Sequence, residues 1–191
     1  LHDALPISRV AIDRQNLPGL RPQSGIWISS IVKPQSFFPP DQFCFLNVSE
    51  RIASVADWNN KQFDRLWLYN LHYFDDLAAI DANNRLKAHL QLIHRWIKDN
   101  PPGEKTGWEP YPLSLRIINW IKWSLNFAVR DQDFVNSLAL QVRFLRHNLE
   151  YHLLGNHLYE NAKALVFGGM FFEGKEADEW LNKGFQLLQD Q

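Results

Sequence analysis

The chain has 191 residues, a net charge of −1 and one cysteine, Cys44. This length suits a single domain with a substantial core, and a hydrophobic content of 46% excludes a disordered chain. The near-neutral charge gives no footprint for nucleic acid, and one cysteine excludes an intramolecular disulfide or a cysteine-cluster metal site. No apolar run reaches the length that a membrane span needs.

Aromatic residues make up 14% of the chain and include 8 Trp. A flat aromatic ring can stack on a sugar while its polar edge makes hydrogen bonds. Large rings also fill the gaps between packed helices, so composition alone leaves sugar binding and core packing both open.

The N-terminal part of the chain is poor in helix signals. Residues 1–8, LHDALPIS, look like one reading frame of a sequencing adapter, and we leave them out of the fold prediction. Residues 9–60 are interrupted by prolines and predict an extended, irregular arm, in which 25–32 and 43–48 are candidate short strands.

From about residue 60 the apolar spacing becomes helical. Helices are predicted at 61–80, 84–100, 111–129, 131–154 (closed by Gly155), 156–172 and from 176 onward. The short loops between them favour antiparallel hairpins, so residues 61–191 predict an all-α domain of the α/α barrel or toroid type. The last helical pattern has no stop signal before residue 191, which predicts a fragment of a longer protein.

The first candidate site is the Gly155-Asn156-His157 stretch. If Gly155 ends one helix and Asn156 caps the next, free backbone N–H groups and the positive end of the helix dipole meet there and suit a carboxylate. Asn156 adds an amide donor and His157 a titratable imidazole. The alternative is that Asn156 is only a cap and His157 an ordinary first-turn residue.

Two further segments carry polar and aromatic side chains. In GWEPYPLSLR, Trp108 and Tyr111 could stack on a sugar, and Arg116 could pair with a carboxylate or sulfate. The equal alternative is structural: Arg116 forms a salt bridge with an acidic residue, and the aromatic rings serve only packing. In LWLYNLHYFDD, the side chains that could line a polar cleft or form an internal network are Tyr69, Asn70, His72 and Tyr73.

Glu160, near Asn156, completes the predicted substrate-binding set. The histidines at 147, 152 and 157 match no zinc motif, and there is no phosphate-binding loop or nucleophile elbow. We therefore predict no metal and no cofactor.

Three blocks taken together, LYNLHYFDDL, WEPYPLSLRIINWIKW and LEYHLLGNHLYENAKALVFGGMFF, resemble the N-terminal helical domain of heparinase II/III-like polysaccharide lyases. The resemblance covers roughly residues 43–191. It implies an incomplete (α/α) toroid that is followed, in full-length members, by a β-sandwich domain missing from this chain. It also implies a periplasmic or secreted bacterial protein.

Members of this family cleave acidic polysaccharides by β-elimination. The resemblance implies that Asn156 neutralises the uronate carboxylate, and that His157 assists at the carboxylate or acts as the base. The family's catalytic Tyr and a later His would lie beyond residue 191, so the chain alone should be inactive.

Two other functions stay open on the residues. A glycoside hydrolase on an α/α scaffold would use paired carboxylates, for which Glu109, Glu150 and Glu160 are candidates. A non-catalytic glycan-binding domain would use the aromatic rings alone. All three share one fold, so the fold cannot choose between them.

Overall fold

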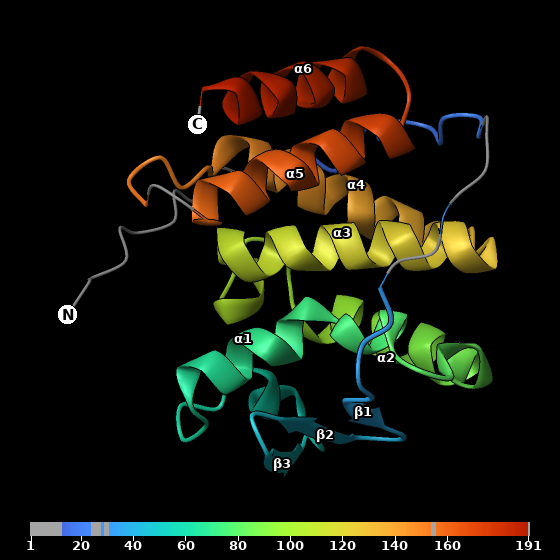
Figure 1. The fold of residues 1–191 in the computed structure, drawn as a ribbon, viewed down its shortest axis with the longest axis vertical. Helices are drawn as coiled ribbons and strands as arrows, with labels where there is room; N and C mark the ends of the chain where they lie inside the picture. Colours follow the sequence, from blue (N-terminus) through green and yellow to red (C-terminus); the bar gives the residue numbers. More distant parts are fainter. Residues whose placement is uncertain (1–12, 24–27, 29–30, 154–155, 191) are drawn as a thin grey trace.

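The computed structural model describes residues 13–23, 28, 31–153 and 156–190. Its helices stack as successive hairpins from a small sheet at one end to the last helix at the other (Figure 1). Their bounds are α1 Arg65–Tyr73, α2 Leu86–Asp99, α3 Pro110–Phe127, α4 Gln132–His147, α5 Asn156–Phe171 and α6 Lys175–Gln189. The prediction of an all-α fold with a short-strand N-terminal arm is confirmed.

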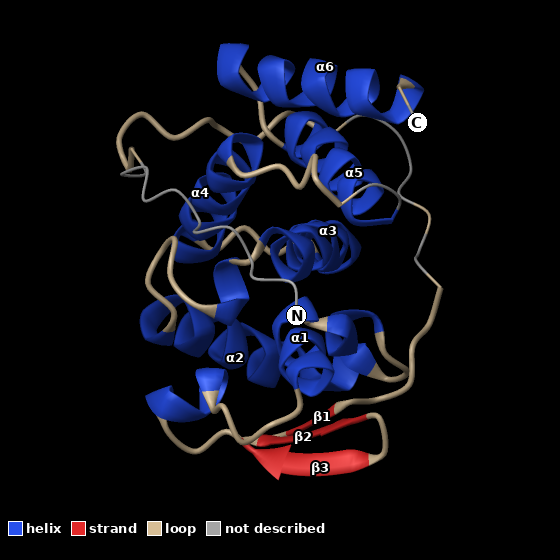
Figure 2. Cartoon of the chain, turned by 90° about the vertical axis from the view of Figure 1, so that its left-hand side faces the viewer, coloured by secondary structure: helices blue, strands red, loops and turns tan. Residues whose placement is uncertain are grey.

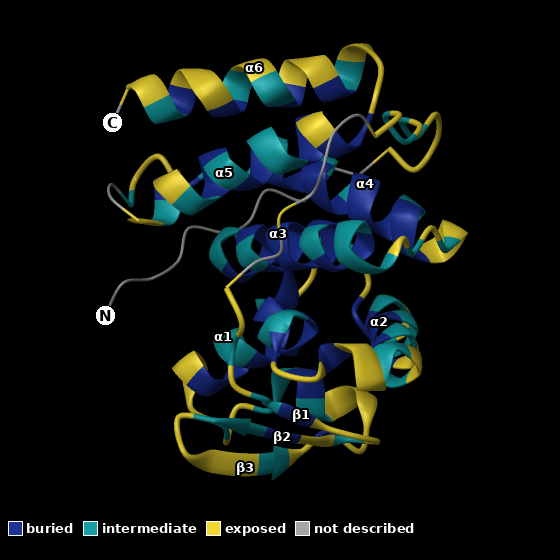
Figure 3. Ribbon diagram, turned by 45° about the vertical axis from the view of Figure 1, so that its right-hand side comes forward, coloured by how far each residue is buried: buried dark blue, intermediate teal, exposed yellow. Residues whose placement is uncertain are grey.

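The helices form two rows. α1, α3 and α5 lie side by side in one row, and α2 and α4 lie in the other (Figure 2). α3, in the middle of its row, also packs against α4 of the other row and is largely buried, whereas α6 and the loops carry many exposed positions (Figure 3). The hydrophobic core is rich in aromatic residues, and every tryptophan that the structure describes is buried: Trp58, Trp67, Trp96, Trp108, Trp120, Trp123 and Trp180.

The arm contains a three-stranded antiparallel sheet, with β1 Phe37–Phe38, β2 Gln42–Phe45 and β3 Val48–Arg51. The predicted strand at 43–48 is split, because Leu46 and Asn47 both have positive φ and form a two-residue hairpin turn. The predicted strand at 25–32 falls partly outside the described residues, and its described positions lie in no strand.

α1 is shorter than the predicted helix over 61–80. It begins at Asp64, whose carboxylate accepts the N–H groups of Leu66 and Trp67 at 2.8 and 3.1 Å. It ends at Tyr73 because Phe74 adopts the left-handed conformation, with φ 61°. A 3₁₀ turn follows and directs Asp76 toward the arm.

α4 also ends earlier than predicted, at His147 rather than near residue 154. The Asn148 side chain donates to the Phe144 carbonyl at 2.8 Å, and its backbone N–H donates to Leu145 at 2.9 Å. The chain then turns inward and buries Glu150. Gly155 is therefore not the residue that closes α4.

The arm makes hydrogen bonds with the helical part of the chain at two separate places. Near its start, Arg21 donates from its backbone N–H to the Phe171 carbonyl at 3.0 Å and from Nε to the Phe172 carbonyl at 3.1 Å. Farther along, Lys33 bridges to Ala79 beside the end of α1. In the described ranges, no helix combines the length and apolar character that a membrane crossing needs.

Candidate functional site

Several predicted site residues meet on one surface formed by α1, α3 and α5, here named the α1–α3–α5 face. The Tyr111 ring of α3 lies with its centroid 6.1 Å from that of Tyr73 on α1 and 4.3 Å from that of His157 on α5. Burial raises the pKa of Tyr111, and the negative charges of Glu160 and Glu150 raise it further. Residues from three separate sequence blocks therefore converge.

The start of α3 is built to present Tyr111. Pro110 occupies the first helical position, where its missing N–H and fixed φ cost nothing. The Ser114 hydroxyl donates to the Pro110 carbonyl at 2.7 Å, one turn along the helix. This closed first turn holds Tyr111, which is partly exposed, beside the start of α5.

His157 is part of a largely buried polar network that joins α5 to α3. Its Nδ1 lies 3.1 Å from Oε1 of Glu150, a carboxylate whose side chain is only 10% exposed. The other oxygen of Glu150 accepts the Asn161 amide at 3.1 Å. That amide also donates to the Ser114 hydroxyl at 3.0 Å, so the network ties α5 to α3.

Asn156 is the first residue of α5 and is exposed. The position before it, where a cap would stand, lies outside the described residues, so the predicted cap role of Asn156 stays a prediction. Its place puts this residue at the helix end that carries the unsatisfied N–H groups and the positive dipole end of α5. Such a position suits an anionic group.

Tyr69 of α1 extends the face. Its hydroxyl contacts Glu109 and accepts a hydrogen bond from Arg65 at 3.0 Å, and Arg65 also pairs with Glu109 at 3.1 Å. Burial and the Glu109 carboxylate raise the pKa of Tyr69 to about 12. Burial likewise raises the pKa of Tyr73. These phenols are neutral hydrogen-bonding groups at neutral pH.

His72 lies in the core instead, with no exposed surface. Its Nδ1 accepts the indole N–H of Trp96 at 3.0 Å, and its Nε2 lies 3.0 Å from the Trp58 carbonyl. Burial and the nearby positive charge of Arg116 lower the pKa of His72 to about 3. The ring is a neutral bridge between helices, so we do not place it in the candidate site.

Arg116 and Trp108 are buried as well, at 0% and 2% exposed. The Arg116 guanidinium stacks over Trp96, 3.9 Å from the ring centroid, and its Nε donates to Gln141 at 2.9 Å. The Trp108 indole donates to the Asn100 carbonyl at 3.2 Å. Neither side chain reaches the surface, so this structure does not support the predicted contact of Arg116 and Trp108 with a substrate.

Lysines join the face beyond the predicted set. Lys33 pairs with Asp75 at 2.5 Å, and Lys163 pairs with Glu160 at 2.9 Å. Lys122 of α3 makes no ion pair with any described residue, and burial together with Lys163 and Lys33 lowers its pKa. Sequence analysis missed it because nothing in the local pattern shows that three distant lysines meet.

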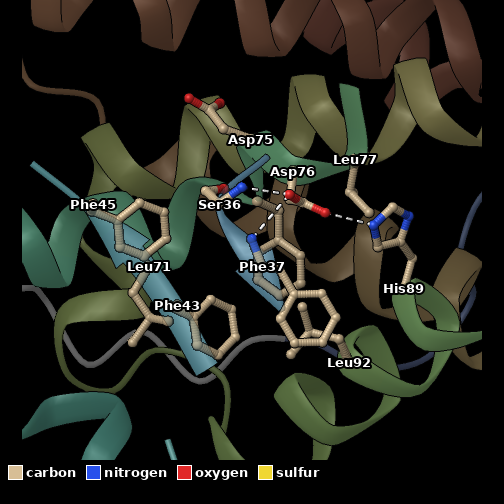
Figure 4. Close-up of a pocket in the computed structure, with 11 residues that line it drawn as sticks. Ser36, Phe37, Phe43, Phe45, Leu71, Asp75, Asp76, Leu77, His89 and Leu92 are labelled. Atoms are coloured by element: carbon tan, nitrogen blue, oxygen red, sulfur yellow. Dashed lines mark hydrogen bonds and ion pairs between the residues drawn. The ribbon is translucent and has the colours of Figure 1, made fainter. Parts of the chain in front are cut away.

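A small pocket lies between the sheet and α2 (Figure 4). Oδ1 of Asp76 accepts the N–H groups of Ser36 and Phe37 at 2.7 and 2.9 Å, and its Oδ2 meets His89 at 2.9 Å and Arg85 at 3.2 Å. Burial would raise the pKa of Asp76, but these hydrogen bonds and the Arg85 charge outweigh burial and lower it. Because both oxygens of Asp76 already have hydrogen-bond partners, we interpret this carboxylate as an attachment point of the arm and not as a ligand site.

No group of His, Cys, Asp or Glu within the described part of the chain is arranged to hold a metal ion.

Comparisons with known proteins agree on one relationship. The family described as Heparinase II/III N-terminus matches residues 18–191. A heparin-sulfate lyase from Bacteroides thetaiotaomicron is 29% identical over 118 residues, which cover 56% of this chain and 17% of that protein. The chain thus matches about a sixth of the length of this relative. No solved structure gives a significant match.

Proposed function

The chain belongs to the heparinase II/III N-terminal family, and from this premise we propose that it is the helical part of a lyase that cleaves a uronate-containing polysaccharide by β-elimination. The observation that carries the proposal is the meeting of His157, Tyr111 and Tyr73 on one face beside Asn156, at the start of α5.

The chemistry needs three contributions. The uronate carboxylate must be neutralised so that the C5 proton becomes acidic, a base must remove that proton, and the departing glycosidic oxygen must gain one. In this proposal the Asn156 amide and the first N–H groups of α5 neutralise the carboxylate. His157 assists at the carboxylate or takes the proton.

The rest of the α1–α3–α5 face suits an anionic sugar chain. Tyr111 offers a partly exposed ring for stacking, and the neutral phenols of Tyr69 and Tyr73 offer hydrogen bonds. Glu160 lies on α5, one turn after Asn156 and His157. Lys122 adds a positive charge on the same row of helices.

The two rows of helices support a further part of the proposal. An (α/α) toroid alternates inner and outer helices, and the neighbour relations α1–α3–α5 and α2–α4 follow that alternation. We expect the complete protein to close more of the toroid and to add a β-sandwich domain, with the remaining catalytic groups beyond residue 191. The 191-residue chain alone should then turn over no substrate.

The test is the product that the complete protein makes from heparan sulfate, alginate and other uronate polysaccharides. A lyase produces an unsaturated uronate that absorbs ultraviolet light. A hydrolase that uses carboxylates such as Glu150 and Glu160 produces new reducing ends without that absorbance, and a binding protein produces neither. Either of the last two outcomes on every polymer would reject the proposal.

A further inference from the structure

The imidazole of His157 is held at one nitrogen and open at the other. Nδ1 lies 3.1 Å from Oε1 of Glu150. A carboxylate accepts hydrogen bonds and donates none, so a hydrogen bond between them places the proton on Nδ1. No described residue hydrogen-bonds Nε2, and the side chain is 31% exposed. In the neutral ring Nε2 is then an acceptor that faces outward.

Glu150 is itself fixed in place. Its Oε2 accepts the Asn161 amide at 3.1 Å, and its backbone N–H donates to Oδ1 of Asn161 at 2.9 Å. Asn161 has no exposed surface, and it hydrogen-bonds both the main chain and the side chain of Glu150. The carboxylate therefore has one orientation, with Oε1 left for His157.

The direction of the Asn161 amide is fixed in turn. Its Nδ2 donates to the Ser114 hydroxyl at 3.0 Å, and that hydroxyl has its own proton committed to the Pro110 carbonyl at 2.7 Å. Rotating the amide by half a turn would set its oxygen against a carboxylate oxygen and its nitrogen against a backbone N–H. The path from Pro110 to His157 thus has a single hydrogen-bond direction.

Few other groups face the ring. Tyr111 from α3 lies against it at 31° between the planes, and that phenol stays neutral because burial, Glu160 and Glu150 raise its pKa. Glu160 lies on the same helix but is paired with Lys163 at 2.9 Å. Among the described residues, Glu150 is the only carboxylate that contacts His157.

We infer that Glu150, oriented by Asn161, is a positioning residue that holds His157 as the Nδ1–H tautomer and makes Nε2 the proton acceptor of the site. This inference rests on the proposed function and deepens it. Nε2 takes the C5 proton, the C5–H electron pair forms the C4–C5 double bond, and the C4–O bond breaks. The departing oxygen takes a proton from water, and the hydroxide that remains takes the proton from His157 and restores the neutral ring. His157 is thereby assigned as base rather than as a donor to the carboxylate.

Nitrogen-15 NMR of histidine-labelled 191-residue chain tests the tautomer without any need for turnover. His157→Ala assigns the signals. At a pH where the ring is neutral, we expect a protonated Nδ1 and an unprotonated Nε2. In Glu150→Gln, the buried Asn161 amide should hold the new oxygen and turn the new NH₂ toward Nδ1, which reverses the tautomer. A wild-type ring protonated on Nε2 would overturn the inference.

A matched control is available. His94 and Asp131 form another histidine–carboxylate pair at 2.8 Å, away from the α1–α3–α5 face. Asp131→Asn keeps a side chain that can cap α4, and it should change the His94 signals while leaving those of His157 in place. If Asp131→Asn shifted the His157 signals as far as Glu150→Gln does, the shift would reflect a general structural change, and the positioning role of Glu150 would be rejected.

Kinetics of the complete protein give the second readout. A general base contributes about 10²–10⁴-fold, so we expect Glu150→Gln to lower kcat by about 10²-fold with little change in KM. In a His157→Ala background the same substitution should cause no further loss, since Glu150 acts through His157. Independent, multiplicative losses would overturn the inference. Absence of an unsaturated product from wild type would reject the proposed function, while the NMR result would still decide the tautomer.

Discussion

One buried carboxylate, Asp76, helps to attach the arm to the helices, and Asp76→Asn tests its contribution. The new amide keeps one oxygen for the N–H groups of Ser36 and Phe37 but sets an NH₂ group against His89 and Arg85. Both the Asp76 and Arg85 side chains are largely buried, at 6% and 12% exposed, so solvent screens the lost pair little. Breaking a buried pair costs about 3–5 kcal/mol. We expect the lower end of this range, because the two backbone contacts can persist.

Thermal unfolding followed by circular dichroism measures this loss. For a chain of this size, 1 kcal/mol shifts Tm by about 2–4 °C, so about 3 kcal/mol predicts a fall of about 6–12 °C. Asp41→Asn is the control, because its partner on the same arm, Arg51, is 70% exposed, so solvent screens this pair and Tm should change much less. An Asp76→Asn variant that melts with wild type would refute the assigned role of this carboxylate.

The same residue predicts a pH dependence. The folded-state pKa of Asp76 lies below its ordinary value of 3.8, so its stabilising contribution is present above that value and lost as the pH falls through the folded pKa. The stability difference between wild type and Asp76→Asn should therefore shrink as the pH falls below about 3.8. A constant difference would contradict this assignment.

Three further predictions concern packing and the tyrosine cluster. In Gly169→Ala the new Cβ would lie 2.6 Å from the Ala177 carbonyl oxygen, so the free energy of unfolding should fall by about 1–3 kcal/mol. Gly19→Ala is the control and should be tolerated, because the nearest atom to its new Cβ lies at 3.4 Å. Arg116→Lys loses the guanidinium fork inside the core, and urea unfolding should show a loss of about 2–3 kcal/mol; an unchanged midpoint would contradict it. Ultraviolet titration should show a phenol that ionises near pH 12 in wild type and is absent from Tyr69→Phe, and wild-type stability should fall as the pH rises from 10 toward 12.

Much of the helical pattern was predictable, because apolar spacing reports the buried face of each helix. The two boundaries that were missed depend on distant partners. α1 ends at Tyr73, and Asp76 then reaches the arm, whereas α4 ends at His147, and Glu150 then turns inward. Neither contact is visible in a local window.

The candidate site divides in a similar way. Sequence analysis named Tyr73, Tyr111 and His157 as separate candidates in three blocks, and the structure brings their rings together. Residue type could not show that Trp108 and Arg116 lie in the core, because both types serve packing and binding equally well. The pairing of Glu150 with His157 also escaped prediction, since the loop between them has no regular spacing.

The central claim is that the start of α5 neutralises a uronate carboxylate, and Asn156→Ala in the complete protein tests it most directly. Removing one donor of this kind costs about 10²–10³-fold in kcat, and the ultraviolet absorbance of the unsaturated product measures it. The proposed function predicts a fall in kcat of that size. Wild-type turnover in Asn156→Ala would contradict the claim.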